Sequence, residues 1–128
     1  MKLLILTATV LFSVFSVSMA GEPANAAPVG VEQAEKRLAE GAQLLDVRTK
    51  DEWDEGHLKG AKLVTVTEDG FLDKAKAAVD PKKPVVIYCR SGRRSAMAAK
   101  QLRAAGFTVY DLDGGITAWE DAGKPLVK

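Results

Sequence analysis

The only cysteine of the chain stands at the head of a strongly basic segment, Cys89-Arg90-Ser91-Gly92-Arg93-Arg94-Ser95. A free thiol with a pKa near ~8.5 is only a few per cent ionised at pH 7, so a nucleophilic cysteine needs neighbours that favour the thiolate. Guanidinium groups and inward-pointing amides favour both a thiolate and a bound anion. The segment therefore predicts a nucleophile, Cys89, in an anion-binding loop formed by Arg90, Ser91, Gly92, Arg93, Arg94 and Ser95. The alternative is a buried cysteine followed by a basic, solvated turn.

The elements on either side of this loop predict where the thiol lies. Residues 84–88, PVVIY, are typical of a buried strand, and residues 95–105 are typical of a helix with Gly106 just past its end. In open α/β sheets, ligands bind at the carboxyl ends of the strands. Gly92 can ease a turn that points amides inward, and the helix adds unpaired N–H groups and the positive end of its dipole. We therefore expect the pKa of Cys89 to be lowered.

The rest of the chain alternates strand-like and helix-like segments. The predicted helices cover residues 31–40, 71–79, 95–105 and 116–122, and the predicted strands cover 43–47, 84–88 and 108–112. Residues 62–66 form a further extended piece, and residues 51–56 a charged turn or short helix. This alternation predicts an α/β domain with a central, mostly parallel sheet and helices on both faces.

Composition narrows the functional classes. The chain has 128 residues, 18 Lys and Arg against 17 Asp and Glu, one Cys and one His. Near-neutral charge argues against a dedicated nucleic-acid binder. A single cysteine excludes an intramolecular disulfide and a CxxC redox motif. One Cys and one His argue against a zinc site, so we expect no metal.

The N-terminus predicts export. Lys2 precedes a largely apolar stretch over residues 3–17, and Ser18-Met19-Ala20 follows. This order is typical of a signal peptide over residues 1–20 that is cleaved after Ala20, with Ala26 as a second possible site. A permanent membrane anchor is the alternative. We expect a periplasmic or secreted protein without a stable membrane anchor, with a flexible lead-in over residues 21–30 and one domain over residues 31–128.

The residues leave few chemistries for a thiolate at position 89. No second cysteine can resolve an intramolecular disulfide. His57 lies more than thirty positions upstream, so sequence alone does not bring it to Cys89 as a general base, and a structural role in a turn is favoured. Attack on an anionic electrophile remains, either a sulfur donor or a phosphate ester.

Three stretches resemble those of single-domain rhodaneses. They run from Asp46-Val47-Arg48 through Glu52-Trp53 to Gly56-His57-Leu58-Lys59-Gly60-Ala61, from Val85 to Ser95, and from Leu112 to Trp119. With the predicted signal peptide, the chain resembles an exported rhodanese. The resemblance implies a rhodanese-like three-layer domain and a sulfurtransferase that takes sulfane sulfur from thiosulfate or a similar donor onto Cys89 as a persulfide. Cyanide or a thiol is then the acceptor, and no cofactor is required.

The resemblance also implies roles for individual residues. Backbone amides of residues 90–95 match the anion cradle, and Arg94 matches a position that helps to bind the donor. Asp46 and Arg48 match polar positions that steady the active-site region, although a strand-end salt bridge without a catalytic part is an equal interpretation. Gly114 and Gly115 match a turn near the site. Trp119 is interpreted as a core residue.

Two other functions are weighed against this one. Cysteine phosphatases and related arsenate reductases carry a Cys-x5-Arg loop, but the position six after Cys89 is Ser95, and Arg94 falls one short. A sulfur carrier or binding module with a dedicated partner needs the same loop as the enzyme, so the sequence does not separate the two. We expect a monomer that binds small anionic donors and thiophilic acceptors and no nucleic acid.

Overall fold

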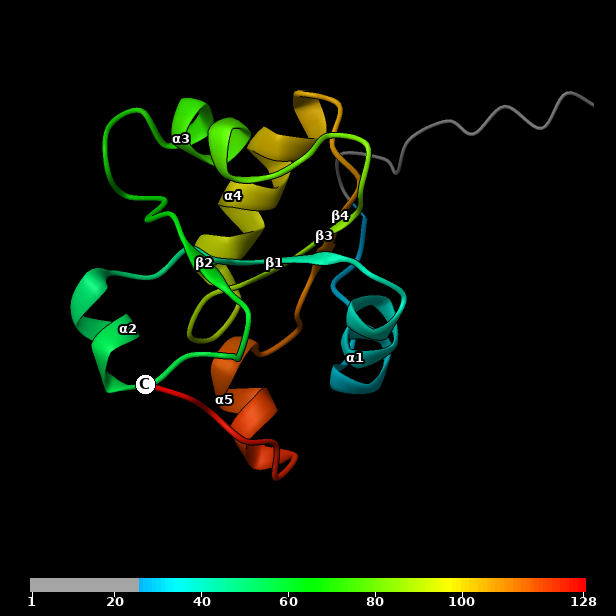
Figure 1. The fold of residues 1–128 in the computed structure, drawn as a ribbon, viewed down its shortest axis with the longest axis vertical. Helices are drawn as coiled ribbons and strands as arrows, with labels where there is room; N and C mark the ends of the chain where they lie inside the picture. Colours follow the sequence, from blue (N-terminus) through cyan, green and yellow to red (C-terminus); the bar gives the residue numbers. More distant parts are fainter. Residues whose placement is uncertain (1–25) are drawn as a thin grey trace, which may run out of the picture.

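The computed structural model describes residues 26–128 (Figure 1). The predicted signal peptide and the first part of the lead-in lie outside the described residues. The helices are α1 (Val31–Ala39), α2 (Lys50–Glu55), α3 (Phe71–Ala78), α4 (Arg93–Ala104) and α5 (Gly115–Asp121). The strands are β1 (Gln43–Asp46), β2 (Lys62–Leu63), β3 (Val85–Tyr88) and β4 (Val109–Asp111). Within residues 26–128, no helix is long and apolar enough to cross a bilayer.

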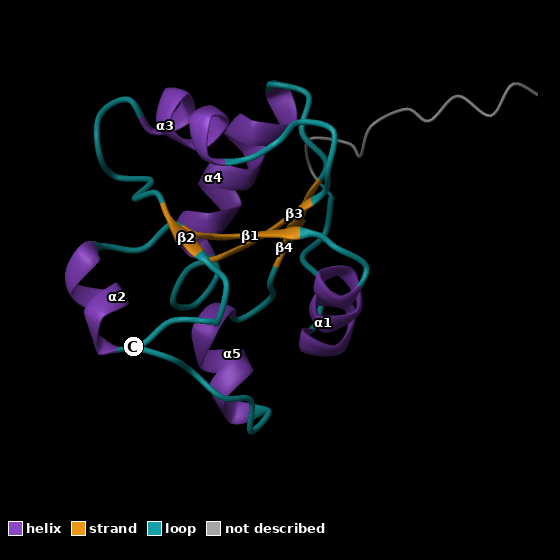
Figure 2. Cartoon of the chain, in the orientation of Figure 1, coloured by secondary structure: helices purple, strands orange, loops and turns teal. Residues whose placement is uncertain are grey.

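The strands form one parallel sheet in the order β2-β1-β3-β4. β1 and β3 lie side by side at its centre, and their register pairs Asp46 with Tyr88. The carboxyl ends of both strands therefore meet at one edge, where the chain continues into Cys89. The α/β fold with helices on both faces is confirmed (Figure 2).

Each face of the sheet has its own apolar core. Along β3, Val85 and Ile87 pack into one core with residues of α3 and α4, whereas Val86 and Tyr88 pack into the other with residues of α1 and α5. All four strand positions are fully buried. Burial of such side chains stabilises the fold by roughly 1.5–3 kcal/mol each. Trp119 lies in the second core, as predicted.

Helix α4 begins at Arg93, so the prediction that it begins at Ser95 is wrong by two residues. Gly92 is the residue before the helix and has φ 112°, a left-handed conformation that glycine adopts at little cost. The chain therefore turns sharply enough to enter the helix at once. Arg93 and Arg94 consequently lie in its first turn instead of in an extended loop.

The predicted charged segment at residues 51–56 is a helix, α2, held by a capping box. The backbone N–H of Glu52 donates to the Thr49 hydroxyl, and the Glu52 carboxylate accepts from Thr49. This reciprocal arrangement satisfies N–H groups that a helix start otherwise leaves unpaired. It also fixes the direction of the Glu52 side chain.

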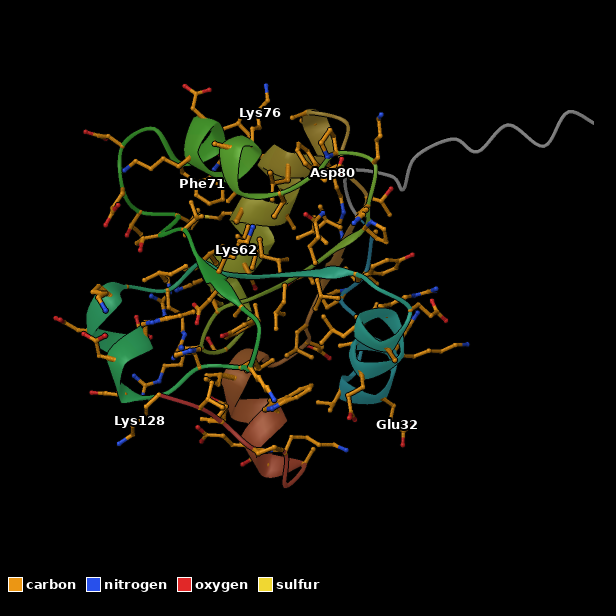
Figure 3. All side chains as sticks on the ribbon, viewed as in Figure 1. Glu32, Lys62, Phe71, Lys76, Asp80 and Lys128 are labelled. Atoms are coloured by element: carbon orange, nitrogen blue, oxygen red, sulfur yellow. The ribbon has the colours of Figure 1, made fainter. Side chains whose placement is uncertain are left out.

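Two contacts tie the margins of the fold to the sheet. Lys62, labelled in Figure 3, extends from β2 and donates to the Ala78 carbonyl of α3 at 2.8 Å. Val29, within the predicted lead-in, forms a parallel bridge with Leu112. The described end of the lead-in therefore joins the edge of the sheet beyond β4.

Candidate active site

Cys89 follows β3 directly, at the carboxyl edge of the sheet, and its side chain is buried. The Gly92 amide donates to Sγ at 3.1 Å, and Sγ lies 3.4 Å from Ser95 Oγ. Ser95 is also buried, and its hydroxyl accepts from the Cys89 thiol and donates to the Gly92 carbonyl at 3.2 Å. The loop therefore curls around the sulfur atom.

These contacts lower the pKa of the Cys89 thiol. Burial is the largest influence and raises the pKa, but hydrogen bonds from the Ser95 hydroxyl and from the amides of Ser95, Gly92 and Ser91 together outweigh it. The direction agrees with the expectation from sequence. Its main favourable cause is hydrogen bonding to the thiolate, which stabilises the charged form.

Helix α5 holds the outer side of the same loop. The Ile116 amide donates to the Cys89 carbonyl at 2.9 Å, and the Thr117 amide donates to the Arg90 carbonyl at 3.3 Å. Gly115 permits this approach, because a Cβ atom there would lie 2.4 Å from the Cys89 carbonyl oxygen. The carbonyls of Cys89 and Arg90 are thus bonded to α5, while the Gly92 amide donates to the sulfur. The Gly114-Gly115 turn lies beside the site, as the resemblance implied.

A buried polar network supports the strand end that carries Cys89. Arg48 donates through Nη2 to Asp46 at 2.7 Å and to the Gly56 carbonyl at 2.8 Å. Tyr88, the residue before Cys89, donates its hydroxyl to Asp46 at 2.6 Å and accepts from the Leu58 amide at 3.1 Å. Burial and the Asp46 carboxylate raise the pKa of Tyr88, so it stays a neutral donor. The network links Asp46 and Arg48 to Tyr88, the residue before Cys89, and their role in steadying the active site stays a prediction.

No role was expected for Tyr88 from the sequence. The available signal was its position at the polar end of an otherwise apolar strand, directly before the cysteine. Its partner could not be identified from the sequence, because Asp46 lies on another strand.

A second arginine–carboxylate pair lies at the rim of the loop. Arg94 donates through Nη1 and Nη2 to the two carboxylate oxygens of Glu52, at 2.6 and 2.9 Å. This hydrogen bonding to Arg94 lowers the pKa of Glu52 to about 2. From the sequence, Glu52 stood out only as part of a motif. A glutamate three residues after a threonine is a capping-box pattern and could have drawn attention to Glu52, but it does not reveal the bond to the loop.

Comparison with known proteins identifies the domain. Residues 30–122 match the model of the rhodanese-like domain. The chain belongs to the rhodanese-like domain family. It is 35% identical over 123 residues to thiosulfate sulfurtransferase 18 of Arabidopsis thaliana, which covers 87% of this chain and 90% of that protein.

Further relatives agree with this assignment. The chain is 35% identical to the chloroplastic thiosulfate sulfurtransferase 16 of Arabidopsis thaliana, over 84% of this chain and 98% of that one. A crystal structure of a rhodanese-related protein from Thermoplasma volcanium superposes with a TM-score of 0.70. It shares 24% identity and covers 80% of this chain and 98% of its own, which shows the common fold.

The loop after Cys89 contains most of the predicted site residues, but these residues differ in their exposure to solvent. Arg90, Ser91 and Arg93 are exposed, whereas Ser95 is buried against the sulfur. Arg94 lies at the rim and is paired with Glu52. A role of Arg90, Arg93 and Arg94 in binding the donor stays a prediction.

A polar cavity of about 280 Å³ opens beside the loop. Arg90 and Glu52 line one part of it, and Thr117 and Glu120 of α5 line another. A larger cavity, of about 380 Å³, lies elsewhere, against Leu38 and Lys62. Of these two cavities, only the smaller one borders the loop that carries Cys89, through Arg90.

His57 occupies a structural position. Its ring stacks on Trp53 with centroids 3.5 Å apart, and its backbone pairs with Val127. Nδ1 lies 3.2 Å from the Trp53 carbonyl. These contacts account for the histidine without a general-base role, the interpretation that the sequence favoured. Within residues 26–128, no group of three His, Cys, Asp or Glu side chains is placed to hold a metal ion.

Proposed function

We propose that this rhodanese-like domain is a sulfurtransferase that carries sulfane sulfur on Cys89. The donor is thiosulfate or a similar anion, and the acceptor is cyanide or a thiol. The observation that carries the proposal is the environment of Cys89 Sγ, which accepts from the Gly92 amide at 3.1 Å and lies 3.4 Å from Ser95 Oγ. The relatives named thiosulfate sulfurtransferases support the same donor.

The chemistry takes two displacements. The Cys89 thiolate attacks the outer sulfur of thiosulfate, the S–S bond of the donor breaks, and sulfite leaves with the bonding electron pair. The new persulfide anion remains near the Gly92 and Ser91 amides, which stabilise negative charge there. A thiophilic acceptor then attacks the terminal sulfur, and Cys89 leaves as the thiolate. The covalent intermediate implies ping-pong kinetics.

The geometry favours a sulfur donor over a phosphate ester. The residue six positions after Cys89 is Ser95, whose hydroxyl is buried beside the sulfur. A phosphatase loop of one more residue would have an arginine there to surround the phosphoryl group. Arg94 instead directs its guanidinium toward Glu52 on α2.

Export and a monomeric state complete the proposal. Both rest on sequence features: the apolar stretch that precedes Ala20, and a composition that suits one small domain. The intact mass of protein purified from a native envelope fraction tests the cleavage site, and sedimentation tests the oligomeric state.

The proposed reaction is tested by intact mass spectrometry. Incubation with thiosulfate should add one sulfur to the wild-type protein, and cyanide should remove it. Cys89→Ser should gain no sulfur and should remain folded, because the two side chains differ little in volume. A sulfur gain without catalytic turnover would indicate a carrier with a dedicated partner. No gain from thiosulfate or from persulfide donors, together with Cys89-dependent hydrolysis of an aryl phosphate, would contradict the proposal.

A further inference from the structure

One arginine of the anion loop, Arg94, already has a carboxylate partner. Arg94 is close enough to Cys89 that the thiolate helps to raise the pKa of the guanidinium, yet both of its terminal nitrogens are bonded to Glu52. We propose that Glu52 is a specificity-determining residue that limits how much negative charge the donor site accepts, by occupying the guanidinium of Arg94. This inference rests on the proposed sulfur transfer from an anionic donor.

Glu52 is held in place by its own helix. Its carboxylate accepts from the Thr49 hydroxyl at 3.1 Å, and its amide donates back to that hydroxyl at 3.4 Å. The side chain is only 20% exposed. With a pKa of about 2, the carboxylate remains ionised throughout the range in which a thiolate reacts. A donor that approaches Arg94 therefore competes with a preorganised, permanently charged internal anion.

The carboxylate partners of the nearby arginines determine which positive charges an anionic donor meets. The charge of Arg48 is matched by Asp46, and that of Arg94 by Glu52. In the described part of the chain, Arg90 and Arg93 have no carboxylate partner, and both are exposed, so water and salt screen them. Glu52 thus neutralises the charge of Arg94, which is less exposed to water than Arg90 and Arg93. The dianion thiosulfate loses more from this than a donor with less charge.

The test is the variant Glu52→Gln, because glutamine keeps the hydrogen-bonding role at the third position of a capping box but carries no charge. Glu52→Gln should lower the KM for thiosulfate about three- to tenfold, as expected for one partly shielded charge. Its kcat should change less than twofold, and its KM should rise more steeply with salt than that of the wild type. The matched control is Asp54→Asn on the same helix, whose exposed carboxylate pairs with Lys50 and does not line this cavity; it should leave KM within twofold.

Arg94→Ala completes a double-mutant cycle. Alone it should raise the KM for thiosulfate, because it leaves the Glu52 carboxylate uncompensated. Glu52→Gln combined with Arg94→Ala should return KM close to the wild-type value, since a neutral pair has then been removed. A merely structural pair would instead show equal losses of kcat in both single variants. That result, or an unchanged or higher KM in Glu52→Gln, would overturn the inference.

A binding measurement separates this inference from the proposed reaction. Thiosulfate is titrated by NMR into Cys89→Ser protein with and without Glu52→Gln, since no sulfur can transfer in either. The Kd for thiosulfate should be about three- to tenfold lower in the protein that carries both Cys89→Ser and Glu52→Gln than in Cys89→Ser alone. If wild-type Cys89 gains no sulfur but this Kd falls, the proposed reaction fails and the role of Glu52 stands. An unchanged Kd overturns the role of Glu52 even where the wild type forms a persulfide.

Discussion

Two arginine–carboxylate pairs flank the candidate site, and they differ in environment more than in geometry. The shortest N···O distances are 2.7 Å for Arg48–Asp46 and 2.6 Å for Arg94–Glu52. The side chains of the first pair are 5% and 0% exposed, whereas those of the second are 25% and 20% exposed. The first pair also bonds to Tyr88 and to the Gly56 carbonyl.

The difference in burial suits the inner pair to supporting the fold and the rim pair to acting on a bound donor. A charge that is buried with its partner cannot be left alone without a large desolvation penalty, so the inner pair serves as a fixed part of the fold. A pair at the rim remains in partial contact with water, so its charges can act on an approaching anion. The same two functional groups thus hold the strand end in one place and, by our inference, select the donor in the other.

Removal of the inner carboxylate should produce the largest effect. Asp46→Ala leaves Arg48 buried without its counter-ion and should lower the free energy of unfolding by about 3–5 kcal/mol. Urea denaturation followed by far-UV circular dichroism measures this loss. The control is Asp54→Ala, which removes an exposed carboxylate paired with Lys50 and should change stability by less than about 0.5 kcal/mol. Equal losses in the two variants would contradict the division between support and rim.

Loss of the Tyr88 hydroxyl should have the next largest effect. Tyr88→Phe removes the donor to Asp46 and the acceptor for the Leu58 amide but keeps the ring, and should lower the free energy of unfolding by about 1–3 kcal/mol. Tyr110→Phe is the matched control, since the Tyr110 ring packs under Arg37 and is only partly buried. Urea denaturation of both variants gives the comparison. A loss no larger than in the control would show that the network does not depend on Tyr88.

Breaking the rim pair should cost little stability. Arg94→Ala should lower the free energy of unfolding by about 0.2–1 kcal/mol, as is usual for partly exposed ion pairs. The same protein should show the raised KM for thiosulfate described above. The two measurements, on one preparation, therefore sharpen the contrast with Asp46→Ala. A stability loss as large as that of Asp46→Ala would place both pairs in the supporting framework.

The smallest effect should be the loss of fold stability when Glu52 is protonated in acid. The pKa of Glu52 is lowered from its ordinary value of 4.5 to about 2, chiefly by hydrogen bonding to Arg94. A carboxyl group whose pKa is lowered by folding stabilises the folded state at every pH above its ordinary pKa. This contribution is lost as the pH falls from about 4.5 toward 2. Stability measured over that range should therefore fall more steeply in the wild type than in Glu52→Gln. Identical slopes would show that the pair contributes nothing to folding.

Local patterns in the sequence were sufficient for most of the fold. The apolar run at residues 84–88 predicted β3, and the alternation of segments predicted a parallel sheet, because strand and helix periodicity are properties of neighbouring residues. The start of α4 was misplaced. Its position depends on the left-handed conformation of Gly92, and a glycine in a basic segment is equally compatible with a longer loop.

The sequence on its own determined where the thiol lies and what surrounds it. Cys89, Gly92 and Ser95 are close in the chain, so a strand–loop–helix pattern sufficed to predict a thiol surrounded by amides and a lowered thiol pKa. The partners that arrive from elsewhere were decided only by the tertiary structure. Glu52 reaches Arg94 across 42 positions, Tyr88 reaches Asp46 across the same separation, and α5 binds the carbonyls of Cys89 and Arg90. Such contacts depend on which strands become neighbours and how helices pack on them, and no local pattern specifies that.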